Sequence, residues 1–218
     1  MNHHHTLMLG VALLVGSSCT SSLHAQTDPS PSLSLIGGVS SNTLAGKDAA
    51  DNLDRRLGVL AGLSVVYSLT SMVQLEVDAL YARKGFRSPG ATSTFDFSSS
   101  YLEIPLLLRL EFAPNRRVRP FIVAGPAFGA QIDCGGTTTS SSGALDLNCT
   151  ELVARSGILV KKTDVSAVLG GGIGFPLGAV HLTLATRYTM GFLSVIGNND
   201  NHNRALSFYM GLSRARRD

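Results

Sequence analysis

The chain has 218 residues, of which 44% are hydrophobic and 15% are charged, and its net charge is +3. Soluble domains usually carry about 25% charged residues, so this chain has too few charges for an ordinary water-facing surface. It also lacks the run of roughly 18 consecutive apolar residues that a membrane-spanning helix requires. The small, scattered charge excludes nucleic acid as an expected partner. Such a chain is either almost entirely core or a transmembrane β-barrel.

Residues 1–25 have the features of a secretory signal peptide, and residues 26–218 are the expected mature domain. Residues 7–15 form a short apolar run, and the tripeptide that ends at Ala25 suits a cleavage site. The segment departs from the usual pattern because no Lys or Arg precedes the apolar run. A lipoprotein signal at Cys19 is the alternative, although a glycine stands where that signal has a leucine. We therefore expect an exported protein.

Two cysteines remain after removal of the leader, and both lie in one polar segment, at Cys134 and Cys149. In an oxidising compartment such a pair usually forms a disulfide that closes a loop. A metal site would need further Cys or His residues at ligand spacing, and none is nearby. The sequence predicts a disulfide between Cys134 and Cys149 and no metal site.

Alternation of apolar and polar residues is the main structural signal in the mature chain. It is strongest in residues 101–112, where every even position is apolar and the odd positions include charged residues. Because side chains alternate between the two faces of a strand, this segment is predicted to be a strand with one apolar and one polar face. Residues 73–81 and 180–188 repeat the pattern. Weaker alternation predicts five more strands, at 33–40, 57–68, 118–132, 164–175 and 204–213.

The connections between these eight predicted strands alternate in length. Short links are expected at 69–72, 113–117 and 176–179, and long polar links at 41–56, 85–96, 133–163 and 192–203. This alternation places all long loops at one end of an up-and-down sheet. Transmembrane barrels have short periplasmic turns and long extracellular loops in this way. The predicted fold class is therefore all-β, an eight-stranded antiparallel up-and-down transmembrane β-barrel.

The direction in which the polar faces point decides between this fold and a soluble, lipocalin-like barrel, whose interior is apolar. Charged side chains can pair with one another inside a tube, whereas charges that face lipid cannot. Glycines at even spacing also suit the close packing inside a narrow barrel. We therefore expect the apolar faces to point outward and the polar faces inward. The expected lumenal polar network comprises Glu76, Asp78, Glu103, Arg109, Glu111, His181 and Arg187.

Aromatic residues gather near the ends of the predicted strands, as in the girdles at the two lipid–water boundaries of membrane barrels. Those expected near the short turns are Tyr67, Phe112, Phe175 and Phe208, and those expected near the long loops are Tyr81, Phe128 and Tyr188.

Four segments also carry a family resemblance. Residues 101–108, Tyr-Leu-Glu-Ile-Pro-Leu-Leu-Leu, resemble the YLEIPLLLK strand of the PorT-like outer-membrane β-barrel proteins common in Bacteroidetes. Residues 119–126 are similar to the next strand of that family, RPYLFAGP, and residues 169–174 and 187–192 are similar to its later glycine-rich and RYSLGL segments. The resemblance implies a barrel in a Gram-negative outer membrane, in contact with outer-membrane lipid and with the assembly machinery that inserts barrels. It implies no particular activity, because most members have none assigned.

Two features of the chain depart from that family pattern. Outer-membrane strands often finish on an aromatic residue, whereas this chain continues past Tyr209 into a basic tail at 214–218. The polar segment 133–163, with its two cysteines, is particular to this chain.

The sequence contains no Ser-His-Asp, zinc or nucleotide-binding motif, so we expect no enzyme activity and no cofactor. The expected function is that of a non-enzymatic, porin-like outer-membrane barrel with loop-mediated recognition or a structural role in the envelope, whose extracellular or envelope partner the sequence does not name. One alternative is a lipid-modifying barrel enzyme that uses His181, with Thr183 on the same face, or His202 in the last long link. The others are a small pore and a soluble lipocalin-like periplasmic binder.

Overall fold

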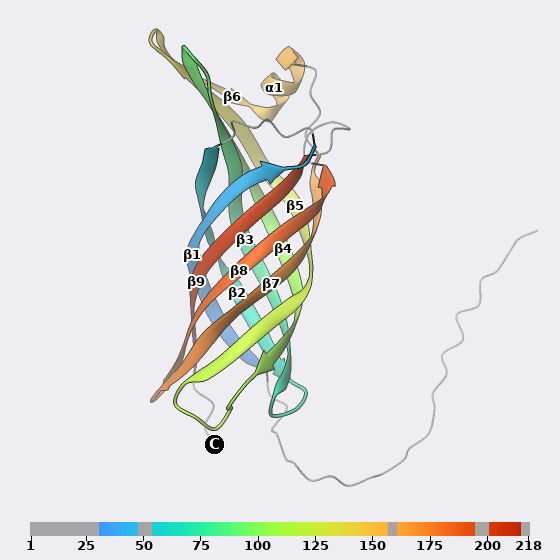
Figure 1. Cartoon of the computed structure of the whole chain (residues 1–218), viewed down its shortest axis with the longest axis vertical. Coiled ribbons are helices and arrows are strands. Elements are labelled where there is room, and N and C mark those ends of the chain that lie inside the picture. The colour runs from blue at the N-terminus through green and yellow to red at the C-terminus, as the bar shows by residue number, and fades with distance from the viewer. Residues whose placement is uncertain (1–30, 48–53, 157–160, 195–200, 215–218) are drawn as a thin grey trace, which may run out of the picture.

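The computed structural model describes residues 31–47, 54–156, 161–194 and 201–214, which form a closed β-barrel with a sheet rising from one end (Figure 1). The elements are β1 (Ser32–Ala45), β2 (Asp54–Ser68), β3 (Val73–Pro89), β4 (Ser93–Glu111), β5 (Arg119–Ser140), β6 (Gly143–Asn148), α1 (Cys149–Ser156), β7 (Thr163–Leu177), β8 (Val180–Ser194) and β9 (His202–Arg214). The expected leader and the C-terminal tail beyond Arg214 lie outside the described residues. No helix among those residues is long and apolar enough to cross a membrane.

Eight strands close the barrel, and each pairs antiparallel with its neighbours in an up-and-down order. The first and last strands, β1 and β9, pair from Ser34↔Ser213 to Ala45↔His202, which leaves the barrel without a free edge. The strand β5 pairs with β7 as far as Ala130 and with β6 from Gly135 onward, so β6 lies outside the closed wall. All eight predicted strands are present, and the predicted fold is confirmed.

Three short turns lie together at one end of the barrel, as predicted. The turn between β2 and β3 is held by the Thr70 hydroxyl, whose Oγ1 accepts hydrogen bonds from the backbone N–H groups of Met72 at 3.2 Å and Val73 at 2.9 Å. The turn between β7 and β8 contains Gly178 at a φ of 63°, a conformation that glycine adopts without a steric penalty.

The two faces of the wall have the polarity expected from the sequence. On β4 the side chains of Leu102, Ile104 and Leu108 are exposed on the outside, whereas Leu107 and Arg109 are buried inside. The outer surface is therefore apolar, and the interior combines charged groups with apolar clusters. Of the aromatic residues expected near strand ends, Tyr67, Phe112 and Phe175 lie there, at the short turns. Tyr81, Phe128, Tyr188 and Phe208 lie in the middle of their strands, because β3, β5 and β8 extend beyond their predicted ends and Phe208 is central in β9.

Glycines on the inner face allow opposite side chains to fill the narrow lumen. A Cβ atom on Gly172 would lie 2.6 Å from both the Phe121 ring and the Cβ of Ala185. On the outer face, a Cβ on Gly37 would meet nothing within 4 Å.

We expect Gly172→Val to lower the free energy of unfolding by about 1–3 kcal/mol, because the added methyl groups overpack the lumen. The matched control Gly37→Val adds the same group on the open outer face and should leave that free energy unchanged or slightly higher. Urea titration of the refolded barrel would compare the two variants. Equal effects at both positions would contradict the inward orientation of Gly172.

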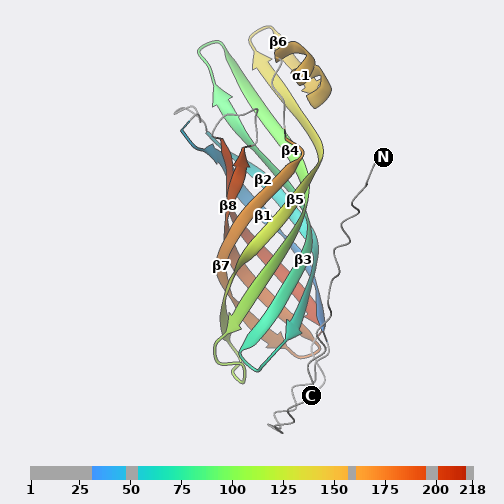
Figure 2. The same cartoon turned by 90° about the vertical axis from the view of Figure 1, so that its right-hand side faces the viewer.

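The largest difference from the sequence prediction is at the long-link end. The segments 85–96 and 133–163 were expected to be loops, but β3, β4 and β5 continue upward, and β6 and α1 pack beside them (Figure 2). We call the part of β3–β6 above the barrel, residues 85–89, 93–98, 133–140 and 143–148, the protruding sheet. Its inner face carries an aromatic cluster in which the Phe86 and Phe97 rings stack 5.3 Å apart and Phe95 lies 6.4 Å from Phe86. This buried apolar area lets the strands extend beyond the barrel.

Candidate functional site

The lower half of the lumen is occupied by an ion network centred on Arg187 of β8. Arg187 Nη1 donates to Asp78 Oδ2 at 2.5 Å, and Nη2 pairs with Glu76, so one guanidinium group connects β8 to two carboxylates of β3 across the lumen. Arg109 of β4 donates to the other oxygen of Glu76 at 3.2 Å and lies 3.6 Å from Glu111. All five side chains are buried.

A second cluster lies higher in the lumen, toward the protruding sheet. Lys84 of β3 pairs with Glu103 of β4 and lies 3.4 Å from Asp164 Oδ2 of β7. Asn203 of β9 donates to the same oxygen of Asp164 at 2.9 Å. Four strands are therefore linked at this level through groups buried in the barrel.

Lys84, Asp164 and Asn203 were not among the predicted network residues, although the alternation contains the signal for each. Lys84 lies three residues past the end of the predicted strand 73–81. It is an even number of residues from Glu76 and Asp78, and so it shares their face of the strand. Asn203 lies one residue before the predicted strand 204–213, so extending these two strands would have found both residues. Asp164 is already the first residue of the predicted strand 164–175, on the same face as its inward glycines.

Aromatic rings flank the guanidinium groups of the lower network. The Arg109 guanidinium carbon lies 3.5 Å from the centre of the Phe121 ring, and that of Arg187 lies 4.5 Å from the Tyr209 ring. These cation–π contacts add attraction for charges held away from water. The cavity between Lys84 and Arg187 measures about 30 Å³, which is space for one or two water molecules and not for a substrate.

The predicted network residue His181 and the proposed enzyme residue His202 lie far apart. His181 is the second residue of β8, near the short turns, where its ring fills the space beside Gly174. Thr183 follows it on the same face, next to Gly211. His202 begins β9 at the opposite end of the barrel and pairs with Ala45 and Ser194. The structure therefore does not bring the two histidines into one site.

The protruding sheet is fastened by the predicted disulfide. Cys134 of β5 is bonded to Cys149 at the start of α1, with the two Cα atoms 5.4 Å apart. The helix start is closed by a reciprocal capping pair, in which Asn148 Oδ1 accepts from the Glu151 N–H and Glu151 Oε2 accepts from the Asn148 N–H, each at 2.9 Å. Both cysteines pack against the aromatic cluster of the sheet. The segment 133–156 therefore has a fixed shape.

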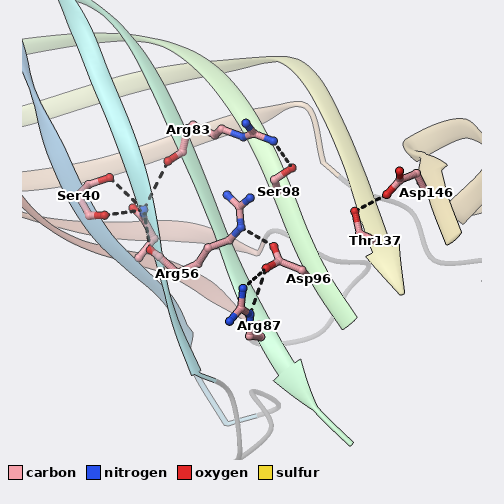
Figure 3. Close-up of polar contacts among 9 residues, drawn as sticks. Ser40, Arg56, Arg83, Arg87, Asp96, Ser98, Thr137 and Asp146 are labelled. Atoms are coloured by element: carbon pink, nitrogen blue, oxygen red, sulfur yellow. Dashed lines mark hydrogen bonds and ion pairs between the residues drawn. The ribbon is translucent and has the colours of Figure 1, made fainter. Parts of the chain in front are cut away.

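An ion triad joins β2 to the protruding sheet (Figure 3). Arg56 Nε donates to Asp96 Oδ1 at 2.5 Å, while Arg87 donates from Nε and Nη2 to Oδ2 at 3.1 and 2.9 Å. Partial burial would raise the pKa of the Asp96 carboxyl, but the hydrogen bonds from Arg56 and Arg87 lower it below its usual value. Asp96 therefore stays charged and holds both guanidinium groups in place.

These features define a class of protein. The barrel is closed and antiparallel, with an apolar outer surface, a charged interior and short turns at one end. In such a barrel every backbone N–H and C=O group of the wall is hydrogen-bonded, which allows the chain to cross a lipid bilayer as strands. Residues 24–197 match the family described as outer membrane protein beta-barrel domain, and the chain belongs to this family. Membership assigns the protein to a Gram-negative outer membrane.

Comparison with curated proteins finds no match. Among solved structures, the chain is similar to Neisserial surface protein A, with 14% identity, a TM-score of 0.47 and coverage of 84% of this chain and 97% of that one. It is similar to Ail, the attachment invasion locus protein of Yersinia pestis, with 13% identity, a TM-score of 0.41 and coverage of 84% and 97%. It is also similar to the outer membrane enzyme PagL, with 16% identity, a TM-score of 0.41 and coverage of 83% and 98%. These similarities concern the fold alone.

Proposed function

We propose that this protein is a non-enzymatic outer-membrane barrel, of the porin-like and PorT-like type, whose protruding sheet recognises a partner outside the cell. Residues 1–25 direct its export, and the outer-membrane assembly machinery inserts residues 26–218 among outer-membrane lipids. The motif at 101–108 supports the PorT-like assignment. No cofactor and no nucleic acid take part.

The observation that carries this proposal is the contrast between the two ends of the barrel. The lumen is crossed by buried ion pairs from Arg187 and Lys84, which leave space for little more than a water molecule. A pore or a lumenal active site would need that space. The outer end instead carries a sheet that is stiffened by a disulfide and an aromatic cluster. Rigid, exposed elements of this kind are suited to binding because little conformational entropy is lost on association.

The test uses cells that produce either the full chain or a chain in which a short Gly-Ser turn replaces residues 134–161. Both are applied to printed arrays of glycans and extracellular-matrix proteins, after heat-dependent gel mobility has shown that both barrels are folded. We expect the full chain to bind one class of probe and the shortened chain to lose that binding. A control chain with the same turn in place of residues 114–117, at the periplasmic end, should bind like the full chain.

Three results would overturn the proposal. The first is equal array binding by the shortened and full chains, or binding by neither. The second is stepwise conductance of the full chain in a planar bilayer. The third is a change in the mass profile of the membrane lipids that disappears when His181 or His202 is replaced by alanine.

A further inference from the structure

The cavity between the Arg187 network and the Lys84 cluster is lined by three side chains that each carry an unpaired polar atom. Besides Arg187, they are Asn42 of β1 and Tyr209 of β9. Within the described part of the chain, Arg187 Nε, Tyr209 Oη and Asn42 Oδ1 have no hydrogen-bond partner. The three residues are 5%, 7% and 2% exposed, so bulk water does not reach them. The barrel therefore leaves donors and acceptors unpaired around one small space.

The orientation of the Asn42 amide is fixed by its nitrogen. Asn42 Nδ2 donates to Ser40 Oγ at 3.0 Å and to the carbonyl oxygen of Arg56 at 3.2 Å. The carbonyl oxygens of Ser40 and Arg83 each lie 3.4 Å from the same nitrogen. Carbonyl oxygens only accept hydrogen bonds, so the nitrogen of the amide must face them. The oxygen of the amide is then left as an acceptor.

The Arg187 guanidinium also has one donor to spare. Its two terminal nitrogens are used by carboxylates, Nη1 by Asp78 and Nη2 by Glu76, and the Nε–H group remains. The guanidinium carbon lies 4.5 Å from the centre of the Tyr209 ring, which brings the two side chains together beside the cavity. Hydrogen bonds from a charged donor are stronger than those between neutral groups, so an acceptor for this N–H is strongly favoured.

The size and lining of the cavity suit water. Its volume is about 30 Å³, and one water molecule needs roughly 10–15 Å³ of such space, so about two molecules fit. Ser40, Thr189 and Ser207 add hydroxyl groups to the lining, and most of the remaining wall is apolar. Buried waters are held where each finds two to four polar partners, whereas purely apolar cavities stay dry.

We propose that two ordered water molecules bind in this cavity and link the Lys84 cluster to the Arg187 network. One water accepts the Arg187 Nε–H, the other accepts the Tyr209 O–H, and water hydrogens are donated to Asn42 Oδ1. Left unpaired, each of these groups would lower the equilibrium constant for folding by about five- to a hundredfold. Lys84 and Glu103 line the same cavity, so the waters stand between the two ion clusters. This binding site goes beyond the proposed function, which concerns the protruding sheet.

The experiment measures magnetisation transfer from water to the methyl groups of the unmodified full chain by NMR. The chain is deuterated except at its methyl groups and refolded in detergent micelles. Methyl groups of Leu60, Leu80 and Ala205 line the cavity and should show water cross-peaks of the sign that marks bound water. The control is Leu107, which is 0% exposed and packs in the apolar cluster with Phe121. Its methyl groups should show no water cross-peak.

The variant Tyr209→Phe distinguishes a hydrated cavity from a dry one by the sign of its effect. The phenylalanine ring keeps the face that the Arg187 guanidinium contacts, and only the hydroxyl is lost. With water bound, the equilibrium constant for folding in a urea titration should fall about two- to tenfold, and the cross-peaks should weaken. In a dry cavity the same change removes a buried unpaired hydroxyl, so the constant should rise. The control Tyr67→Phe removes an exposed hydroxyl and should leave the constant unchanged.

Three results would overturn the proposal. The first is the absence of water cross-peaks at the cavity methyl groups, and shifts of their signals under xenon would then identify the cavity as dry. The second is a higher equilibrium constant for folding in Tyr209→Phe. The third is an equal cross-peak at Leu107, which would mean that water enters the whole core without a specific site. None of these measurements depends on array binding by the protruding sheet, so either proposal can fail without the other.

Discussion

Replacing Arg187 with methionine should lower the free energy of unfolding of the barrel by about 3–5 kcal/mol. The methionine fills similar space, but Asp78 and Glu76 would lose the partner that offsets their removal from water. Both carboxylates are buried in the lumen, where an unpaired charge is costly. Urea titration of the protein folded in lipid vesicles, followed by the gel shift between folded and unfolded barrel, measures the change.

Two further variants separate the ion network from simple loss of a side chain. Arg117→Met removes an exposed arginine at the short turns and should change the free energy of unfolding by less than about 0.5 kcal/mol. Adding Glu76→Gln and Asp78→Asn to Arg187→Met removes the unpaired charges and should recover a large part of the loss. A loss below about 1 kcal/mol for Arg187→Met would show that the network is hydrated and contributes little.

Replacing both Cys134 and Cys149 with serine should expose the outer segment to proteases while leaving the barrel intact. The bond closes a loop with a sequence separation of 15, and such a cross-link is worth about 3 kcal/mol in a chain-entropy estimate. Because β6 and α1 are anchored at one side only, we expect loss of the bond to destabilise this segment and not the whole barrel. The segment should then open locally about a hundredfold more often than in the unmodified protein. Cleavage between residues 141 and 162 by added protease should speed up accordingly.

The same assay has internal controls. A reducing agent should give the unmodified protein the cleavage rate of the double serine variant, and it should have no effect on that variant. The heat-dependent gel shift should be the same in all samples, because the bond lies outside the closed wall. Equal cleavage rates with and without the bond would show that the capping pair and the aromatic cluster fix the segment by themselves.

The residues at 101–112 show why so much of the fold could be predicted. A strand places alternate side chains on opposite faces, so the order of apolar and polar residues states which side chains meet lipid. The lengths of the links then determine which strand ends lie together. The disulfide could be predicted because Cys134 and Cys149 are the two cysteines that remain after removal of the leader. The protruding sheet was missed because its strands carry Ser, Thr and Gly on both faces, and the signal from Phe86, Phe95 and Phe97 is short.

The sequence by itself determined the number of strands that close the barrel, the face that their side chains take, the end at which the long segments gather and the pairing of Cys134 with Cys149. Only the tertiary structure decided which groups meet across the lumen and along the outer wall. Arg187 and Asp78 lie 109 positions apart in the chain, and Arg56 reaches Asp96 across the intervening strand. Alternation fixes the face of a side chain but not its height, which depends on the stagger between neighbouring strands and on the tilt set by barrel closure. For that reason the two lumenal clusters and the Asp96 triad depend on the closed barrel and not on any single segment.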